Sequence, residues 1–475
     1  MKSTNNVARN AAWLIAQPIL VGIVSIVVIA LVARDLGTAN YGTLLLLLSY
    51  VAVFSQIGGL GLRPYSVREI AADRNRAAEI VSDMLVLRSL LAVMTMILAI
   101  AFLAFVDPSL PAPLVVALCA LILLNALAGC FIDGLQGLEH MKAVATSFAF
   151  GGVFVQLACL AALFFHLGLY GIVAAYTIGA LVMLAIVWYQ FYRATGGLIA
   201  RGVGSHQLVH LHKSWAFLLQ NVVGTIRGRV DLLLVNAILG LHAAGIYGSA
   251  TILIQRLDQI NDGISTALFP RIAHLHGRSS RELIDLVRGA LKVVLLMSTP
   301  MAVGLLAVSS DVIDLMFGSQ YSESGAVLAI LGGAIPFMFV TGVLYTALRA
   351  MGLEGVVFII SVRATVLTVA FLIICTFVTG VRGAALASLL GSATLAAMLI
   401  AEYWRRVGMP WVTRDLAHII IANSAMGVAL YLLRYQHLAI KVIVAAVVFA
   451  LVARMLGLVT MSMLKNLFAS REQMH

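Results

Sequence analysis

Long apolar runs follow one another along almost the whole chain. A membrane-spanning helix needs about 20 consecutive, mostly apolar residues, and fourteen stretches of the sequence are long enough. They are residues 12–33, 42–61, 84–106, 112–132, 143–165, 168–190, 214–240, 245–269, 289–309, 323–348, 355–379, 382–403, 415–434 and 437–459. The pattern predicts an all-α, polytopic membrane protein. The short stretches between the runs leave no room for a soluble catalytic domain, so we expect no enzyme.

The composition agrees with this prediction. The chain is 62% hydrophobic and only 11% charged, and a soluble protein would leave much of that apolar surface in water. The first run lacks a cleavage site after a short apolar core, so we interpret it as helix 1 and not as a signal peptide. The four cysteines lie inside spans without paired spacing, as small apolar residues of the interior do.

The distribution of positive charge predicts the orientation. If the N-terminus is cytoplasmic, most of the 31 lysines and arginines fall on inside loops, and only Arg34, Arg382, Arg434 and Lys441 fall outside. The positive-inside rule then places both termini in the cytoplasm, and we expect a bacterial inner-membrane location. The net charge of +11 indicates contact with anionic membrane lipids and not with nucleic acid.

The sequence contains an internal repeat. Several markers recur in the same order at a nearly constant spacing: Trp13 and Trp215, Leu36-Gly37 and Leu239-Gly240, Tyr41-Gly42 and Tyr247-Gly248, Arg68 and Arg271, Gly137-Leu138-Glu139 and Gly352-Leu353-Glu354, Gly168 and Gly380. Six helices per copy is an even number, which predicts two parallel repeats around a central cavity. We expect lobes at residues 1–213 and 214–410, followed by two further helices and the tail at 411–475.

Several of these blocks resemble a known family. The stretch Ala33-Arg34-Asp35-Leu36-Gly37 through Tyr41-Gly42 is similar to the first outside turn of the polysaccharide-export proteins. These form the O-antigen-type oligosaccharide flippase branch of the multidrug, oligosaccharidyl-lipid and polysaccharide exporter superfamily. Gly59-Leu60-Gly61-Leu62 with Arg68-Glu69-Ile70-Ala71, Gly245-Ile246-Tyr247-Gly248 and Phe269-Pro270-Arg271 look like further blocks of that family.

Charged residues inside the predicted spans concentrate in helices 7 and 8. A charge at the bilayer centre costs roughly 2.5–3.5 kcal/mol on insertion scales, so each needs a reason. By the repeat, Arg227, Arg229 and Asp231 replace Ser25, Val27 and Ile29 of helix 1. The residues that we predict to bind the substrate are Arg227, Arg229, Arg256, Arg363, Gln220, Asn221, Gln255 and Gln259, and the candidates for ion coupling are Asp231, Asp258 and Asp262.

Helical spacing decides which of these side chains can act together. Arg227 and Asp231 share a face and are able to pair. Gln255, Asp258, Gln259 and Asp262 form one polar stripe of helix 8, with Arg256 beside it. The alternative is that the charges are inter-helix ion pairs that only hold the second lobe together. Arg88 is predicted to reach the inner membrane surface. For Arg363 two predictions stay open: its side chain reaches the membrane surface, or it faces the cavity.

The histidine spacing and the prolines are weaker indications of function. His206, His210 and His212 have ligand-like spacing, but they lie in a predicted interfacial amphipathic stretch, and we expect no metal or other cofactor. Pro18, Pro300 and Pro336 interrupt predicted helices, where proline removes a backbone hydrogen bond and favours a kink.

The resemblance implies a flippase that moves a polyprenyl-pyrophosphate-linked oligosaccharide across the membrane for surface polysaccharide such as lipopolysaccharide or exopolysaccharide. An H⁺ or Na⁺ gradient is a candidate driving force, and a polymerase and chain-length complex is a candidate partner. Three alternatives stay open: a cation-coupled multidrug exporter, a lipid II flippase, and a non-transporting scaffold of a glycan-assembly complex. The multidrug exporters tend to have an acidic residue in helix 1, whereas residues 11–33 of this chain contain none. The lipid II flippases have basic residues in the first helices, whereas the spans of helices 1 and 2 lack them in their interiors.

Overall fold

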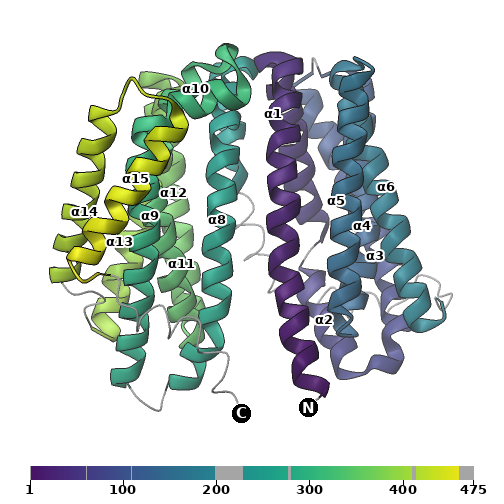
Figure 1. The fold of residues 1–475 in the computed structure, drawn as a ribbon. Coiled ribbons are helices and arrows are strands. Elements are labelled where there is room, and N and C mark those ends of the chain that lie inside the picture. The colour runs from purple at the N-terminus through teal and green to yellow at the C-terminus, as the bar shows by residue number, and fades with distance from the viewer. Residues whose placement is uncertain are drawn as a thin grey trace. The chain divides into compact units, whose positions relative to one another are not determined.

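The described part of the chain is entirely helical. The computed structural model describes residues 2–59, 61–108, 110–197, 228–276, 280–408 and 413–458, and all regular structure in these ranges is α-helix or short 3-10 helix (Figure 1). The chain divides into two compact units, Met1–Gly245 (unit 1) and Ile246–His475 (unit 2). The all-α fold predicted from the apolar runs is confirmed. The predicted lobe boundary at residue 213 lies outside the described residues and stays a prediction.

Unit 1 contains the first six predicted spans. Its helices are α1 (Lys2–Gly59), α2 (Leu62–Ala72), α3 (Ala77–Val106), α4 (Ala112–Gly137), α5 (Met141–Phe164) and α6 (Gly168–Thr195), with a 3-10 turn at Arg74–Arg76. Two predicted helices are joined in α1, which changes direction at Gly37 (φ 72°, ψ 172°). This backbone conformation favours glycine because it has no Cβ. The helix at residues 228–239 also belongs to this unit.

Unit 2 contains most of α8 (Leu241–Leu275) and the helices after it. These are α9 (Ser280–Phe317), α10 (Glu323–Gly332), α11 (Ile335–Ala350), α12 (Glu354–Thr379), α13 (Val381–Arg406), α14 (Thr413–Leu432) and α15 (Leu438–Met455). Pro336 lies in the first turn of α11, where the span divides into α10 and α11, so the predicted interruption at this proline is confirmed.

Eleven helices in the described ranges are long and apolar enough to cross a membrane. The difference from the fourteen predicted spans has three sources. The two predicted spans 12–33 and 42–61 are joined across the kink at Gly37 and count once. Most of the span at 214–240 lies outside the described residues, and α8 carries too many polar side chains. The polarity of α8 makes it the exception among the long described helices.

The backbone reproduces the sequence repeat at its glycines. Gly37 and Gly240 precede related helices and both have positive φ, 72° and 85°. Gly168, the first residue of α6, and Gly380, the residue before α13, also have positive φ, 59° and 65°. Equivalent positions therefore share a positive φ, which residues other than glycine rarely adopt.

Two repeat-related segments of unit 1 cross with their backbones in close contact. A Cβ on Gly42 of α1 would lie 2.0 Å from the carbonyl oxygen of Leu241, and a Cβ on Gly245 would lie 2.0 Å from the carbonyl oxygen of Thr38. Thr38 Oγ1 also forms a 2.7 Å hydrogen bond with His242 Nδ1. The structure therefore gives Gly245 the role of Gly42, whereas the sequence comparison paired Gly42 with Gly248.

Polar contacts and an apolar cluster fasten the last two helices to α9. Lys441 Nζ of α15 donates to Asp311 at 2.6 Å, and Lys292 Nζ donates to Asp415 of α14 at 2.9 Å. Between these two ion pairs, Asn423 Nδ2 donates to the hydroxyl of Thr299 on α9 at 2.9 Å. The apolar part of this contact consists of Val308, Met426, Leu430 and Ala445. The helices outside the repeat are thus bound along the length of one repeat helix.

Candidate functional site

The N-terminal half of α8 is buried in its bundle. Tyr247 Oη forms a 2.8 Å hydrogen bond with Ser388 Oγ of α13, and Ser249 Oγ donates to Ser324 Oγ of α10 at 2.8 Å. The side chains of Tyr247 and Ser249 are fully buried. These contacts fix the rotation of α8 about its axis, and so determine which side chains of its C-terminal half face outward.

The C-terminal half of α8 presents a polar face. Gln255, Gln259, Asp262 and Thr266 follow one another at intervals of three or four residues and are all exposed on unit 2. Side chains at this spacing lie on one face of a helix. Ile254 and Asn261 lie on the opposite, buried face. Arg256 is half-buried beside the stripe.

Asn261 attaches this half of α8 to α11. Its Nδ2 donates to Asp258 Oδ1 at 3.2 Å and to the backbone oxygen of Met338 at 3.2 Å. Gly342 leaves the space for the amide, because a Cβ there would lie 2.5 Å from the Asn261 side chain. Asp258 therefore contacts the buried anchor and is half-buried, while Asp262 is exposed. Asn261 was not among the predicted site residues, although its seven-residue spacing from the apolar Ile254 puts both side chains on one face of α8.

The other predicted site residues fall at different places. Gln220, Asn221 and Arg227 lie outside the described residues, so the predicted pair of Arg227 with Asp231 is untested. Arg229 is partly exposed in the helix at 228–239. The carboxylate of Asp231 accepts a 2.8 Å hydrogen bond from the backbone N–H of Leu232.

Arg363 lies on an exposed, otherwise apolar face of α12. Ile359 and Val366, one turn to either side on the same face, are 51% and 62% exposed. Arg363 itself is exposed and lies about 14 Å from the start of α12 at 1.5 Å per residue. A guanidinium at this depth on an apolar face is placed either to reach phosphate groups at the membrane surface or to face a cavity.

Arg88 does not reach the membrane surface, and that prediction is wrong. Its guanidinium binds the carboxylate of Asp133 on α4, and the two side chains are only 7% and 2% exposed. The helix α4 continues to Gly137, beyond the predicted span end at 132, so Asp133 is a helical residue facing α3. The ion pair forms because a buried arginine needs a charge of opposite sign close by.

Two residues of α2 complete this buried cluster. Ser66 Oγ donates to Asp133 Oδ2 at 3.2 Å, and Arg63 Nε lies 3.5 Å from Asp133 Oδ1. Gly129 provides room for the guanidinium, since a Cβ there would lie 2.8 Å from Arg88 Nη1. One carboxylate therefore joins three helices of unit 1. Sequence reasoning missed Asp133 because it stood just outside a predicted span.

The two charged regions differ in what they are able to bind. In unit 1, the Asp133 carboxylate is buried and forms an ion pair with the buried Arg88, which suits a structural role. In unit 2, the exposed amides, hydroxyl and carboxylate of α8 offer donors and acceptors for a polar ligand, and Arg256 adds a cationic group of the kind that binds phosphate oxygens. The long apolar helices indicate a multi-pass membrane protein, and this polar face is its candidate ligand-binding surface.

Comparison with known families places the chain more closely. A model described as "Polysaccharide biosynthesis protein" matches residues 7–276, more than half of the sequence. The chain belongs to this family. A second model, described as "Lipid II flippase MurJ", matches residues 230–469. No curated protein matches the chain.

Solved structures confirm the fold. The chain is similar to a lipid II flippase MurJ in an inward closed conformation, with TM-score 0.73 and 14% identity over 92% of this chain and 98% of the other. It is also similar to an inward-facing MATE family multidrug resistance transporter of the MOP superfamily, with TM-score 0.68 and 14% identity over 84% and 98%. A third similar structure is a MOP superfamily transporter from Pyrococcus furiosus, with TM-score 0.54 and 13% identity over 84% of this chain and 94% of the other. The chain therefore has the fold of the MOP superfamily structures.

Proposed function

We propose that this transporter is a flippase for a polyprenyl-pyrophosphate-linked oligosaccharide used in surface polysaccharide synthesis. The observation that supports this most is the polar face of α8, where Gln255, Gln259, Asp262 and Thr266 are exposed on a helix of an otherwise apolar bundle. Hydroxyl-rich sugars need such mixed donors and acceptors. Family membership points to the same class of substrate.

The anionic part of the substrate needs a cation that keeps its charge. A guanidinium stays protonated at any physiological pH and binds phosphate oxygens through two parallel hydrogen bonds. Arg256 is adjacent to the stripe. Arg229 in the helix at 228–239 is a further candidate, and so is Arg227, which lies outside the described residues. Alternating access would carry the headgroup across while the polyprenyl chain stays in the lipid.

The distribution of basic residues gives the proposed orientation in the membrane. We place the protein in the bacterial cytoplasmic membrane with both termini inside, because the basic loops then lie on the cytoplasmic side. The substrate is taken from the inner leaflet, where it is assembled, and released to the polymerase and chain-length complex outside. Labelling of single cysteines placed near Asp107, His242 and Glu323 from outside, and near Arg281 from inside, tests this topology.

The first functional prediction concerns Arg256. Replacement by alanine should lower surface polysaccharide at least about tenfold at normal protein level, because a charge-assisted hydrogen bond of roughly 1.5–3 kcal/mol is lost. Lysine should restore part of the activity, since it keeps the charge without the planar fork. Surface glycan is measured in a flippase-deficient strain that carries each variant.

Arg382→Ala serves as the matched control, because Arg382 is an exposed arginine in the first turn of α13. It should leave export unchanged. Normal export by Arg256→Ala, together with normal export by the Arg227→Ala and Arg229→Ala variants, would remove the phosphate-binding role from these helices.

The second functional prediction concerns energy coupling through Asp262. This carboxylate is exposed on the stripe, while Asp258 contacts Asn261 and has the more structural position. Asp262→Asn should give a folded protein that binds substrate but transports at the same rate with and without an imposed pH or sodium gradient. Asp258→Asn is the comparison variant and should instead lower the amount of folded protein. A full gradient response by reconstituted Asp262→Asn would exclude the coupling role.

A cation-coupled multidrug exporter is the second candidate, and the Asp262 carboxylate favours it, since an acidic group on an exposed face suits cationic drugs. Expression in a drug-sensitive strain separates the two functions. Resistance to cationic drugs without restored surface glycan would support the exporter.

A further inference from the structure

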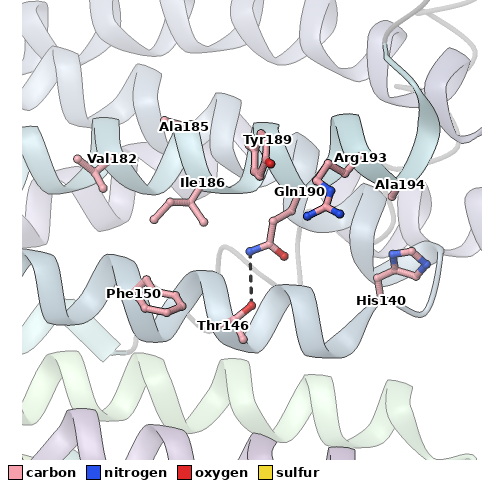
Figure 2. Close-up of a pocket in the computed structure, with 10 residues that line it drawn as sticks. All are labelled: His140, Thr146, Phe150, Val182, Ala185, Ile186, Tyr189, Gln190, Arg193 and Ala194. Carbon is pink, nitrogen blue, oxygen red and sulfur yellow. Dashed lines mark hydrogen bonds between the residues drawn. The ribbon is translucent and has the colours of Figure 1, made fainter.

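A groove in unit 1 lies between α5 and α6, apart from the charged residues discussed so far. It has a volume of about 790 Å³, within the range of roughly 300–1,000 Å³ typical of small-ligand sites. Its lining comes from both helices and from the turn before α5 (Figure 2). We propose that this groove binds one anionic phospholipid of the surrounding membrane.

The groove is polar at one end and apolar at the other. Figure 2 shows Arg193, Gln190 and His140 together at the first end, and Phe150 and Val182 toward the second. This gradient matches a phospholipid, whose charged headgroup and acyl chains have to be accommodated side by side. A soluble anion would use only the polar end, and a hydrocarbon only the apolar end.

The positions of the lining residues along α6 match the headgroup and hydrocarbon levels of a bilayer. The helix has 28 residues and is about 42 Å long, so roughly 6 Å extends beyond a hydrocarbon core of about 30 Å on each side. Arg193 lies about 3 Å from the C-terminal end, Gln190 about 8 Å and Ile186 about 14 Å. The guanidinium therefore stands at headgroup level, the amide at the core boundary, and the apolar lining within the core.

The polar end is held in place by neighbouring side chains. Gln190 Nε2 donates to Ser147 Oγ at 2.9 Å and to Thr146 Oγ1 at 3.4 Å, which fixes the amide against α5. The guanidinium of Arg193 lies 5.9 Å from the ring centre of Tyr189, a distance at which cation–π attraction acts. Trp188 and Tyr192 of the same turns are exposed, as aromatic residues at membrane interfaces are.

Charge complementarity selects an anionic headgroup. In unit 1, the end that holds the groove also carries the exposed Lys142, whereas the nearby Arg68, Arg74 and Arg76 are paired with Glu69, Glu139 and Glu79. Each basic residue near an anionic leaflet contributes about 1 kcal/mol of attraction. Arg193 is able to bind the phosphate and the neighbouring His140 ring to donate a further hydrogen bond, while the Gln190 carbonyl accepts from a headgroup hydroxyl.

Native mass spectrometry of the delipidated full-length protein tests the proposal. The probes are phosphatidylglycerol and phosphatidylcholine with identical acyl chains. The wild-type protein should retain phosphatidylglycerol in preference to phosphatidylcholine. Arg193→Gln should weaken the binding of phosphatidylglycerol about tenfold, which corresponds to roughly 1.4 kcal/mol, and Ala185→Trp should block the groove and weaken it as much.

Arg405→Gln is the matched control. It removes an equally exposed arginine from the end of α13, but there the charge is already compensated by Glu402, whose Oε2 accepts from Arg405 at 2.7 Å. This variant should bind phosphatidylglycerol as the wild type does. Equal retention of both lipids by the wild-type protein, or unchanged binding in both groove variants, would overturn the proposal. The measurement involves no transport, so its outcome is independent of the proposed flippase activity.

Discussion

Replacing Asp133 by asparagine is expected to destabilise the protein by about 3–5 kcal/mol, because it leaves the Arg88 guanidinium buried without a counter-charge. The two side chains are 7% and 2% exposed, so water cannot replace the lost partner. The loss should also loosen α2, whose Ser66 and Arg63 contact the same carboxylate. Thermal unfolding in detergent and the yield of monodisperse protein measure the effect.

The double variant Arg88→Met/Asp133→Leu removes both charges and should recover much of the lost stability, because apolar residues of similar volume often replace a buried ion pair at little cost. Arg74 and Glu139 form an exposed pair, with 55% and 67% of their side chains accessible. Neutralising Glu139 as glutamine should cost at most about 1 kcal/mol. If Asp133→Asn were no more destabilising than Glu139→Gln, the buried pair would not be a structural element.

Valine at Gly42 is expected to open the crossing between α1 and the first turn of α8. Its Cβ would lie 2.0 Å from the carbonyl oxygen of Leu241, and backbone cannot give way as a flexible side chain can. The strain should cost at least about 1–3 kcal/mol and abolish transport. A short bifunctional thiol reagent between cysteines at positions 38 and 242, in a background without native cysteines, should then lose its cross-link, because these side chains are within hydrogen-bond distance only when the crossing is closed.

The symmetric variant Gly245→Val should behave in the same way, since its Cβ would lie 2.0 Å from the carbonyl oxygen of Thr38. Gly22→Ala in the same helix α1 is the control. A Cβ there meets no atom within 4 Å, and alanine is the better helix former by roughly 0.5–1 kcal/mol. Full cross-linking and transport in both valine variants would show that the crossing does not need to close.

The apolar pattern was sufficient to predict the helices because a bilayer imposes a minimum length and forces backbone hydrogen bonds to be satisfied within each segment. The break between the first two helices coincides with Gly37, and the interruption near Pro336 coincides with the division between α10 and α11. Both follow from local backbone preferences that a sequence shows directly.

The polar stripe of α8 was also predictable, because it depends on the spacing of residues along one helix. Its rotation was not. The hydrogen bond from Asn261 to Met338 of α11 and the contact of Tyr247 with Ser388 of α13 decide that Gln255, Gln259 and Asp262 face outward while Asp258 turns toward the anchor. The substrate and the coupling ion stay proposals, since the same face suits more than one polar ligand.

The sequence by itself determined the membrane-spanning helices, the repeat and the family, because hydrophobic length, glycine positions and local motifs are properties of contiguous residues. Only the tertiary structure decided that Arg88 meets Asp133, that Gly42 and Gly245 occupy equivalent places, and that α5 and α6 enclose a groove. Each of these depends on residues of different helices, and their contact is set by how the helices pack and not by their order along the chain.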